Sequence, residues 1–366
     1  MQKTVVHILT KGFASPNGIA FLFPLHFCQR RLRDLHIDCR YFGTVCRELS
    51  QCDVLVIDSR FYSSSWAQEM NAVLEEIHCL SSQVNALLYF DISDSTGWLQ
   101  TQVLPYVDRY YKSQLLKERE NYLEPIYGNR IYADFYHRNW DVVDSEPVLS
   151  RPIKSLEGLQ KLRVSWNSGL ANYSLWGPML SGLRNRISAD FLLRFPNRFV
   201  SARNERPIPI ACRFGITYPR NTVACQRSRI RKMMEGKVAS GKLKRRAYMA
   251  EMERCQIVIS PFGYGEITLK DFEAFMSGAM VLKPEMSHME TWPNLFVGEK
   301  TVKYHSWDLT NLHDVLEEML QDKISRLEIA EQGQESYRHY IATTAGYNEF
   351  ALRFRRILDE VLADVV

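Results

Sequence analysis

The order of apolar and polar positions predicts alternating strands and helices in the first third of the chain. Short apolar runs of strand length lie at residues 4–9, 38–42, 53–58, 86–91 and 107–111. Between them, residues 19–35 and 66–80 carry apolar side chains at helical spacing. Strands this apolar are typical of a parallel, doubly wound sheet that helices cover on both faces.

The pattern restarts after residues 144–152, which contain two prolines and no periodicity and which we expect to form a linker. Strands are then predicted at 162–166, 208–213, 256–260 and 279–282. Helices are predicted at 222–235, 242–254, 269–277, 309–320, 325–340 and 348–362. We therefore expect a first domain over residues 1–150, a second over 151–345, and a closing helix over 346–366.

Composition narrows the class of protein. The chain has 366 residues, of which 46% are hydrophobic and 24% charged, and this balance excludes a mainly disordered protein. A net charge of +4 is too small for a general nucleic-acid coat. The eight cysteines form no C-x-x-C pair, so we expect buried thiols rather than structural zinc. No apolar run has the length of a leader or a membrane span, which favours a cytoplasmic protein.

Residues 257–284 carry the most informative pattern. A buried strand runs into a turn with Gly263 and Gly265 on either side of Tyr264. Thr268, three residues before an aspartate, predicts the start of a helix, and Gly278 predicts its end. A glycine turn at a helix N-terminus presents backbone N–H groups and the positive end of the helix dipole. The segment therefore predicts a phosphate site.

Residues 255–320 resemble the nucleotide-sugar site of GT-B glycosyltransferases of the group-1-like set. Glu273 matches their ribose-binding glutamate, and Glu266 matches the glutamate near the donor sugar, with one residue fewer between the two than in retaining members. The resemblance implies two Rossmann-like domains that face each other across a cleft, with the closing helix packed back on the first domain. It implies a nucleotide-sugar donor on the second domain and a carbohydrate or lipid-linked acceptor on the first.

Cationic side chains near this segment are candidates for the donor diphosphate, because guanidinium groups bind phosphate in a bidentate manner. Arg213 follows a predicted strand and Arg220 lies in the next loop, while Lys270 lies in the first turn of the predicted helix. For both arginines a solvated surface position is the alternative. The sequence contains no D-x-D motif, so we expect a mechanism without a metal ion and no further cofactor.

The first domain offers acceptor-side candidates at the ends of its strands. Asp91 and Asp94 follow a strand, and either could take a proton from an acceptor hydroxyl, although Asp94 could instead cap a turn. Gly12 and Asn17 belong to the loop after the first strand. His26 lies on the first helix, where a core histidine is the alternative to a site residue.

Residues 220–246 carry ten cationic side chains and one acidic one. They could dock on anionic lipid or on a lipid-diphosphate acceptor at the inner face of the membrane, or form a solvated helical face. Specific nucleic-acid binding is not expected, since no recognised module accompanies the run. The resemblance favours a glycosyltransferase of polysaccharide or glycoconjugate synthesis. A sugar-nucleotide epimerase or hydrolase of the same fold, or a non-catalytic lipid- or RNA-binding scaffold, remains open.

Overall fold

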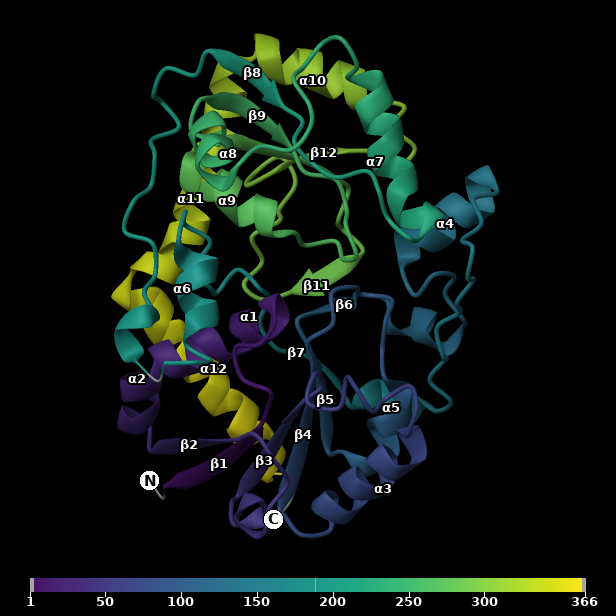
Figure 1. Ribbon diagram of the computed structural model, residues 1–366, viewed down its shortest axis with the longest axis vertical. Helices are drawn as coiled ribbons and strands as arrows, with labels where there is room; N and C mark the ends of the chain where they lie inside the picture. Colours follow the sequence, from purple (N-terminus) through teal and green to yellow (C-terminus); the bar gives the residue numbers. More distant parts are fainter. Residues whose placement is uncertain (1–2, 188, 364–366) are drawn as a thin grey trace.

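The computed structural model describes residues 3–187 and 189–363, which form two lobes (Figure 1). The first lobe contains a six-stranded parallel sheet with the order β2-β1-β3-β4-β5-β7. Its strands are β1 (Thr4–Leu9), β2 (Ile37–Phe42), β3 (Val54–Asp58), β4 (Ala86–Asp91), β5 (Arg109–Lys112) and β7 (Leu162–Val164). The order reverses between β1 and β3, which is the point where ligands bind in doubly wound sheets.

Helices cover both faces of this sheet. Neighbouring residues of a strand point to opposite sides, and in these strands the residues on both sides are apolar and buried. Val56 and Phe90 belong to the cluster that contains the buried residues of the first and last helices, whereas Ile57 and Tyr89 belong to the cluster of the third helix. The helices of this lobe are α1 (Pro16–Phe27), α2 (Gln29–Asp34), α3 (Met70–Ser81), α4 (Ile131–Trp140) and α5 (Leu156–Gln160). Short 3-10 turns lie at η1 (Arg47–Ser50), η2 (Thr101–Tyr106) and η3 (Arg119–Leu123).

The helix predicted over residues 19–35 is divided in the structure. It begins earlier, at Pro16, because the Ser15 hydroxyl accepts a hydrogen bond from the Gly18 amide at 3.1 Å. It is interrupted at Cys28, where α1 ends and α2 begins.

The second lobe contains a four-stranded parallel sheet with the order β12-β10-β9-β8. Its strands are β8 (Ile208–Ala211), β9 (Cys255–Ile259), β10 (Met280–Pro284) and β12 (Lys303–His305). Its helices are α6 (Gly177–Leu183), α7 (Asn221–Met233), α8 (Arg245–Met252), α9 (Leu269–Ser277), α10 (Leu312–Gln321) and α11 (Lys323–Ala342), with a 3-10 turn at η4 (Asp190–Leu192). Helix α9 follows Thr268 and ends at Gly278, whose φ is 68°, as the sequence predicts.

The boundary between the lobes differs from the predicted one at residue 150. Strand β7 lies beyond the predicted linker, yet it pairs with β5 in the first sheet. Strand β6 (Gln114–Leu116) of the first lobe pairs with β11 (Met289–Thr291) of the second, in an antiparallel ribbon that joins the two. The apolar pattern restarts after the prolines at 147 and 152, which suggested a new domain. The pattern does not indicate the sheet in which the next strand pairs, so the boundary was predicted too early.

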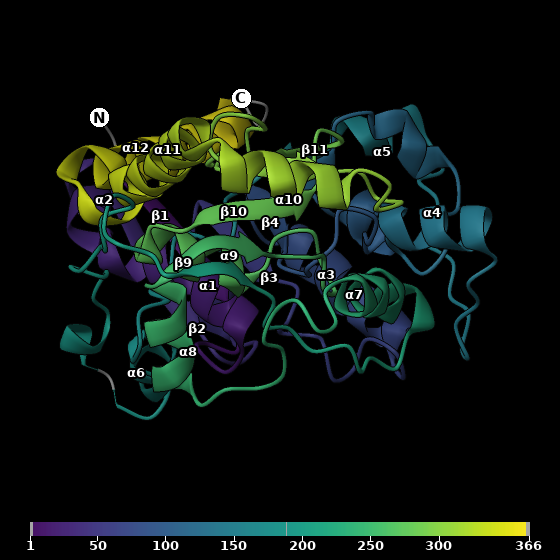
Figure 2. The ribbon, with the colours of Figure 1, turned by 90° about the horizontal axis from the view of Figure 1, so that it is seen from above.

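The closing helix α12 (Thr344–Ala363) returns to the first lobe, as expected (Figures 1 and 2). Arg353 donates hydrogen bonds to the carbonyl oxygens of Val164 at 2.5 Å and Ser165 at 2.9 Å. Phe350 packs edge-on against Trp166, which ties the end of the chain to the first sheet. The predicted architecture of two Rossmann-like domains with a returning helix is confirmed.

Within the described residues, no helix is long and apolar enough to cross a membrane. All eight cysteines are free thiols, and four of them are buried, two half-buried and two exposed. The expectation of buried thiols therefore holds for about half of them.

Candidate functional site

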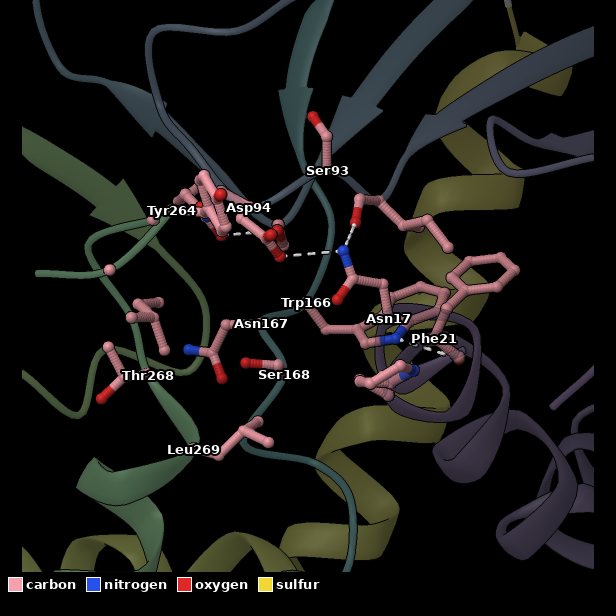
Figure 3. Close-up of a pocket in the computed structure, with 18 of the residues that line it drawn as sticks. Asn17, Phe21, Ser93, Asp94, Trp166, Asn167, Ser168, Tyr264, Thr268 and Leu269 are labelled. Carbon is pink, nitrogen blue, oxygen red and sulfur yellow. Dashed lines mark hydrogen bonds between the residues drawn. The ribbon is translucent and has the colours of Figure 1, made fainter. Parts of the chain in front are cut away.

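A cavity of about 430 Å³ lies between the two lobes (Figure 3). On one side it is bounded by the loop that leads into α9 and on the other by the first turns of α1 and the loop after β4. The segment 166–168, which follows β7, completes the wall between the two sides. The cavity therefore lies at carboxyl ends of strands in both sheets, where doubly wound folds bind their ligands.

The predicted glycine turn lies on the second-domain wall of this cavity. Gly263, Tyr264, Gly265 and Thr268 all line it. A Cβ atom at Gly265 would overlap the carbonyl oxygen of Asp94, so only glycine lets the domains approach this closely. The Thr268 amide donates to the Asp271 carboxylate at 2.8 Å, which fixes the first turn of α9 against the cavity.

Asp271 is itself fully buried and paired with the fully buried Lys283 at 2.9 Å. Burial lowers the pKa of Lys283, while the adjacent Asp271 charge opposes that shift. Each charge of the pair is therefore balanced beneath the helix start. The capping box of Thr268 and Asp271 satisfies one amide of the first turn, and the start of α9 keeps the positive end of the helix dipole.

Arg227 of α7 also lines the cavity and was missed as a site residue by sequence reasoning. It is 7% exposed, and it donates hydrogen bonds to the carbonyl oxygens of Gly215 at 3.1 Å, Pro261 at 3.4 Å and Phe262. In the described part of the chain it forms no ion pair with a carboxylate. Burial lowers its pKa, because desolvation disfavours the cation. A buried guanidinium beside a cavity without a counter-ion is suited to an anionic ligand.

The predicted cations Arg213 and Lys270 are not brought to the cavity wall. Arg213 forms a bidentate ion pair with Glu251 of α8, at 2.8 and 2.6 Å, and this hydrogen bonding raises its pKa. The Lys270 ammonium donates to the Arg213 carbonyl oxygen and to the Tyr248 hydroxyl. Burial lowers the pKa of Lys270 to about 8. Both cations thus hold α8 in place rather than facing a ligand.

Glu266 is fully buried and spans the two domains, so the structure does not support the predicted place beside the donor sugar. Its carboxylate accepts hydrogen bonds from the Thr96 amide at 3.1 Å and the Thr96 hydroxyl at 2.6 Å. Burial alone would raise its pKa, but the adjacent His288 and the hydrogen bonds from Thr96 hold it below the ordinary value. Each oxygen accepts a hydrogen bond from Thr96 of the first domain, and Glu266 does not line the cavity.

Glu273 likewise has partners other than the predicted ribose. It is 5% exposed, and its oxygens bind the Arg245 guanidinium and the Tyr248 hydroxyl, the latter at 2.8 Å. It lies one turn beyond Leu269, the last residue of α9 on the cavity wall. Contact with a ribose would require Arg245 to leave.

On the first-domain wall, the structure joins two predicted residues. The Asn17 amide donates to the Asp94 carboxylate at 2.8 Å and to the Ile92 carbonyl oxygen at 2.7 Å (Figure 3). Asp94 is exposed, so its second carboxylate oxygen remains accessible to an acceptor. A carboxylate oriented by an amide at a cavity wall is a candidate general base.

Asp91 is unsuited to that role. It is buried, and it accepts hydrogen bonds from Lys112 at 3.0 Å, Tyr110 at 2.6 Å and the Ser93 amide at 2.9 Å. Burial would raise its pKa, but the Lys112 charge and these hydrogen bonds hold it below the ordinary value. A carboxylate held this firmly as an anion is a weak base, so Asp91 is a structural residue.

Gly12 and His26, the other predicted acceptor-side residues, do not line the cavity. Gly12 has a φ of 69° and lies beneath Asn185. His26 stacks on Tyr41 with ring centroids 4.1 Å apart, on a part of α1 beyond the cavity. The alternative for His26, a packed histidine, describes its position.

The basic run 220–246 is not one surface. Arg220 and Arg231 donate to carbonyl oxygens, Arg229 lies 3.6 Å from the centre of the Trp140 ring, and Arg245 is paired with Glu273. The exposed members are Arg229, Lys232, Lys237, Lys242, Lys244 and Arg246. The other four cations are at least partly buried and bind groups of the protein itself.

Two Rossmann-like domains that share a cavity and are closed by a returning C-terminal helix define the GT-B fold class. No known protein family and no curated protein matches the sequence. Among solved structures, the chain is similar to sucrose-phosphate synthase of Thermosynechococcus elongatus, with 11% identity over 99% of this chain and 100% of that one and a TM-score of 0.49. It is also similar to HepE of Anabaena in complex with UDP, with 10% identity over 98% and 100% and a TM-score of 0.47. At these values the similarity is distant and assigns no substrate to this chain.

Proposed function

We propose that this protein is a glycosyltransferase that moves a sugar from a nucleoside diphosphate donor to a hydroxyl acceptor. The supporting observation is the interdomain cavity itself. One wall carries the start of α9 and Arg227, and the other carries the accessible carboxylate of Asp94. Such a cavity can hold an anionic leaving group and an acceptor hydroxyl on opposite sides of one reacting sugar.

In this proposal the second domain binds the donor. The diphosphate lies against the Gly263–Gly265 turn and the first turn of α9, where the helix dipole and backbone N–H groups favour negative charge. Arg227 neutralises charge that develops on the leaving diphosphate. Asp94, oriented by Asn17, takes the proton of the attacking hydroxyl. The acceptor is a carbohydrate or lipid-linked saccharide, and the setting is polysaccharide or glycoconjugate synthesis.

We further propose that transfer needs no divalent cation, because the chain supplies a cation and a helix start where a metal ion would otherwise act. The measurement is turnover after EDTA treatment in metal-free buffer. Unchanged turnover supports the proposal. A loss that Mg²⁺ or Mn²⁺ restores contradicts it.

The donor site is tested by a thermal-shift panel of UDP, GDP, dTDP, CDP and CMP, since a ligand that binds the folded state raises apparent stability. Arg227→Met should weaken the best binder by about tenfold to 100-fold, the equivalent of one hydrogen bond to a charged group. Arg231→Met is the matched control, because Arg231 also lies on α7 and donates to the Phe214 carbonyl oxygen but does not line the cavity. Equal losses in both variants would refute the assignment of Arg227.

The rival activities differ in their need for an acceptor. A hydrolase or epimerase of a sugar nucleotide converts the donor alone, whereas a transferase requires an acceptor for full turnover. A peripheral position on anionic membrane is proposed from the exposed cations of the basic run. It predicts that reversing the charges of Lys242, Lys244 and Arg246 abolishes liposome flotation at low salt and leaves turnover of a water-soluble acceptor intact.

A further inference from the structure

A second cavity, of about 310 Å³, lies over the carboxyl ends of β3 and β4. Ser93, Asp94 and Tyr264, which Figure 3 labels in the first cavity, line both cavities, so the two share a wall. The donor site proposed above occupies only the first cavity. The second is the space into which the accessible carboxylate of Asp94 also faces.

Three arginines from three parts of the chain meet in this second cavity. Arg60 follows β3, Arg130 precedes α4, and Arg220 precedes α7. In the described part of the protein none of the three is ion-paired with a carboxylate. The Nη1 groups of Arg130 and Arg220 donate to the same carbonyl oxygen, that of Gly128, at 2.7 and 3.0 Å. Two guanidinium groups this close repel each other, and a bound anion would relieve that repulsion.

The carboxylates near the arginines do not cancel this charge. Asp91 is already neutralised by Lys112. Asp58 is buried beneath the loop, where it accepts hydrogen bonds from the Thr10 hydroxyl at 2.8 Å and the Arg60 amide at 2.9 Å. Even when Asp58 and Asp94 are both counted against them, the three arginines leave one net positive charge beside the cavity.

Asn129 supplies an independent sign of a missing ligand. It is 1% exposed and borders this cavity, and within the described residues neither its amide nitrogen nor its amide oxygen has a hydrogen-bond partner. Leaving a buried amide unpaired costs about 1–3 kcal/mol, which a polar ligand would recover. Serines and two tryptophans complete the wall, and hydroxyl and aromatic groups together suit a sugar. They are Ser59, Ser63, Ser95, Trp66 and Trp98.

We propose that the acceptor is an anionic saccharide whose phosphate or carboxylate is bound by Arg60, Arg130 and Arg220. This rests on the proposed transferase function. The acceptor oxygen forms a bond to the anomeric carbon of the donor sugar while the bond from that carbon to the diphosphate oxygen breaks. The nucleoside diphosphate leaves with the electron pair, and the acceptor proton moves to Asp94.

The first test measures binding of two probes, UDP and inorganic phosphate, by titration calorimetry at low salt. Phosphate is titrated in the presence of saturating UDP, and also in Arg227→Met, so that the donor site does not compete for it. Arg60→Gln and Arg220→Gln should each weaken phosphate binding at least tenfold and leave UDP binding unchanged. Arg227→Met should weaken UDP binding and leave phosphate binding unchanged. Arg47→Gln, which removes an exposed cation from the same domain, is the control and should change neither.

The outcomes separate the two proposals. If neither UDP nor any other nucleotide of the thermal-shift panel binds, but phosphate binding depends on Arg60 and Arg220, the donor assignment fails and the anion site stands. If UDP binds and phosphate either does not bind or ignores both substitutions, the anion site is refuted. Arg130 is left intact because its Nε also donates to the Tyr264 carbonyl oxygen at 2.7 Å and supports the wall shared with the donor site.

The second test compares acceptors that differ only in charge: a sugar phosphate, a uronic acid and a neutral glycoside. Transfer to the first or the second, with a KM at least tenfold higher in Arg60→Gln and little change in kcat, supports the proposal and identifies the anion. Equal transfer to the neutral glycoside, unaffected by Arg60→Gln and Arg220→Gln, overturns it.

Discussion

Replacing Glu266 by glutamine tests whether this carboxylate has a structural or a catalytic role. The resemblance to GT-B glycosyltransferases predicts a role for Glu266 beside the donor sugar. In the structure, its carboxylate instead accepts two hydrogen bonds from Thr96 of the other domain. If the structural role holds, Glu266→Gln and Thr96→Val should weaken the same interaction and lower the stability of the protein together.

The expected magnitude follows from the two hydrogen bonds that Glu266 accepts. A buried hydrogen bond to a charged group contributes about 1.5–3 kcal/mol. Glu266→Gln keeps one acceptor oxygen and loses the charge, so about 2–3 kcal/mol should be lost. Thr96→Val removes the hydroxyl and keeps the amide donor, and should cost a similar amount. Because the substitutions remove one shared contact, the double variant should lose about 1–2 kcal/mol less than the sum of the single losses.

The assay is urea unfolding followed by fluorescence of the seven tryptophans. Glu290→Gln is the control, because Glu290 pairs with Arg119 across the same domain boundary but is 52% exposed, and such a pair should contribute less than about 1 kcal/mol. The structural reasoning is refuted if Thr96→Val leaves the urea midpoint unchanged while Glu266→Gln keeps full stability and abolishes transfer. That result would instead support the predicted role of Glu266 beside the reacting sugar.

Three further predictions concern single residues. Asp94→Asn should lower kcat by about 100-fold or more, the scale for losing a general base, with donor affinity unchanged in calorimetry. Glu273→Gln should lower stability by about 1–2 kcal/mol through its lost charge toward Arg245, and a tenfold loss of nucleotide affinity would instead support the ribose role. Burial lowers the pKa of His305 to about 4, with Lys283 acting in the same direction and the Ser306 and Asp308 oxygens opposing it. Unfolded His305 binds a proton below pH 6.5, so stability should fall by up to about 3 kcal/mol between pH 6.5 and 4, and His305→Asn should flatten this slope in urea titrations.

The sequence predicts local structure well where local chemistry sets it. Thr268 and Gly278 mark the ends of α9 because capping and a left-handed residue act within one turn of the helix. The position of β7 could not be predicted in the same way. A three-residue strand is stabilised by the neighbour with which it pairs, and that neighbour, β5, comes from before the prolines.

The sequence predicted the position of the glycine turn in the candidate site correctly. It predicted the partners of the charged side chains poorly. The glycine turn lies on the cavity wall because it follows the carboxyl end of a parallel strand, and doubly wound sheets bind ligands at that edge. The charged residues depend on distant partners, such as Glu251 for Arg213 and Thr96 for Glu266. One signal could have found Arg227: it shares the helical face of Val223 and Ile230, so its cation points inward.

The carboxylates show why partners decide which group is available for chemistry. A buried carboxylate is stable only with cations or hydrogen-bond donors around it, and those same partners make it a weak base. Asp91 and Glu266 are therefore fixed by Lys112 and Thr96, and Glu273 by Arg245. Asp94 has a neutral amide as its side-chain partner and keeps an accessible oxygen on the wall between the two cavities. If a proton must pass from an acceptor to the protein here, Asp94 is the carboxylate in position to receive it.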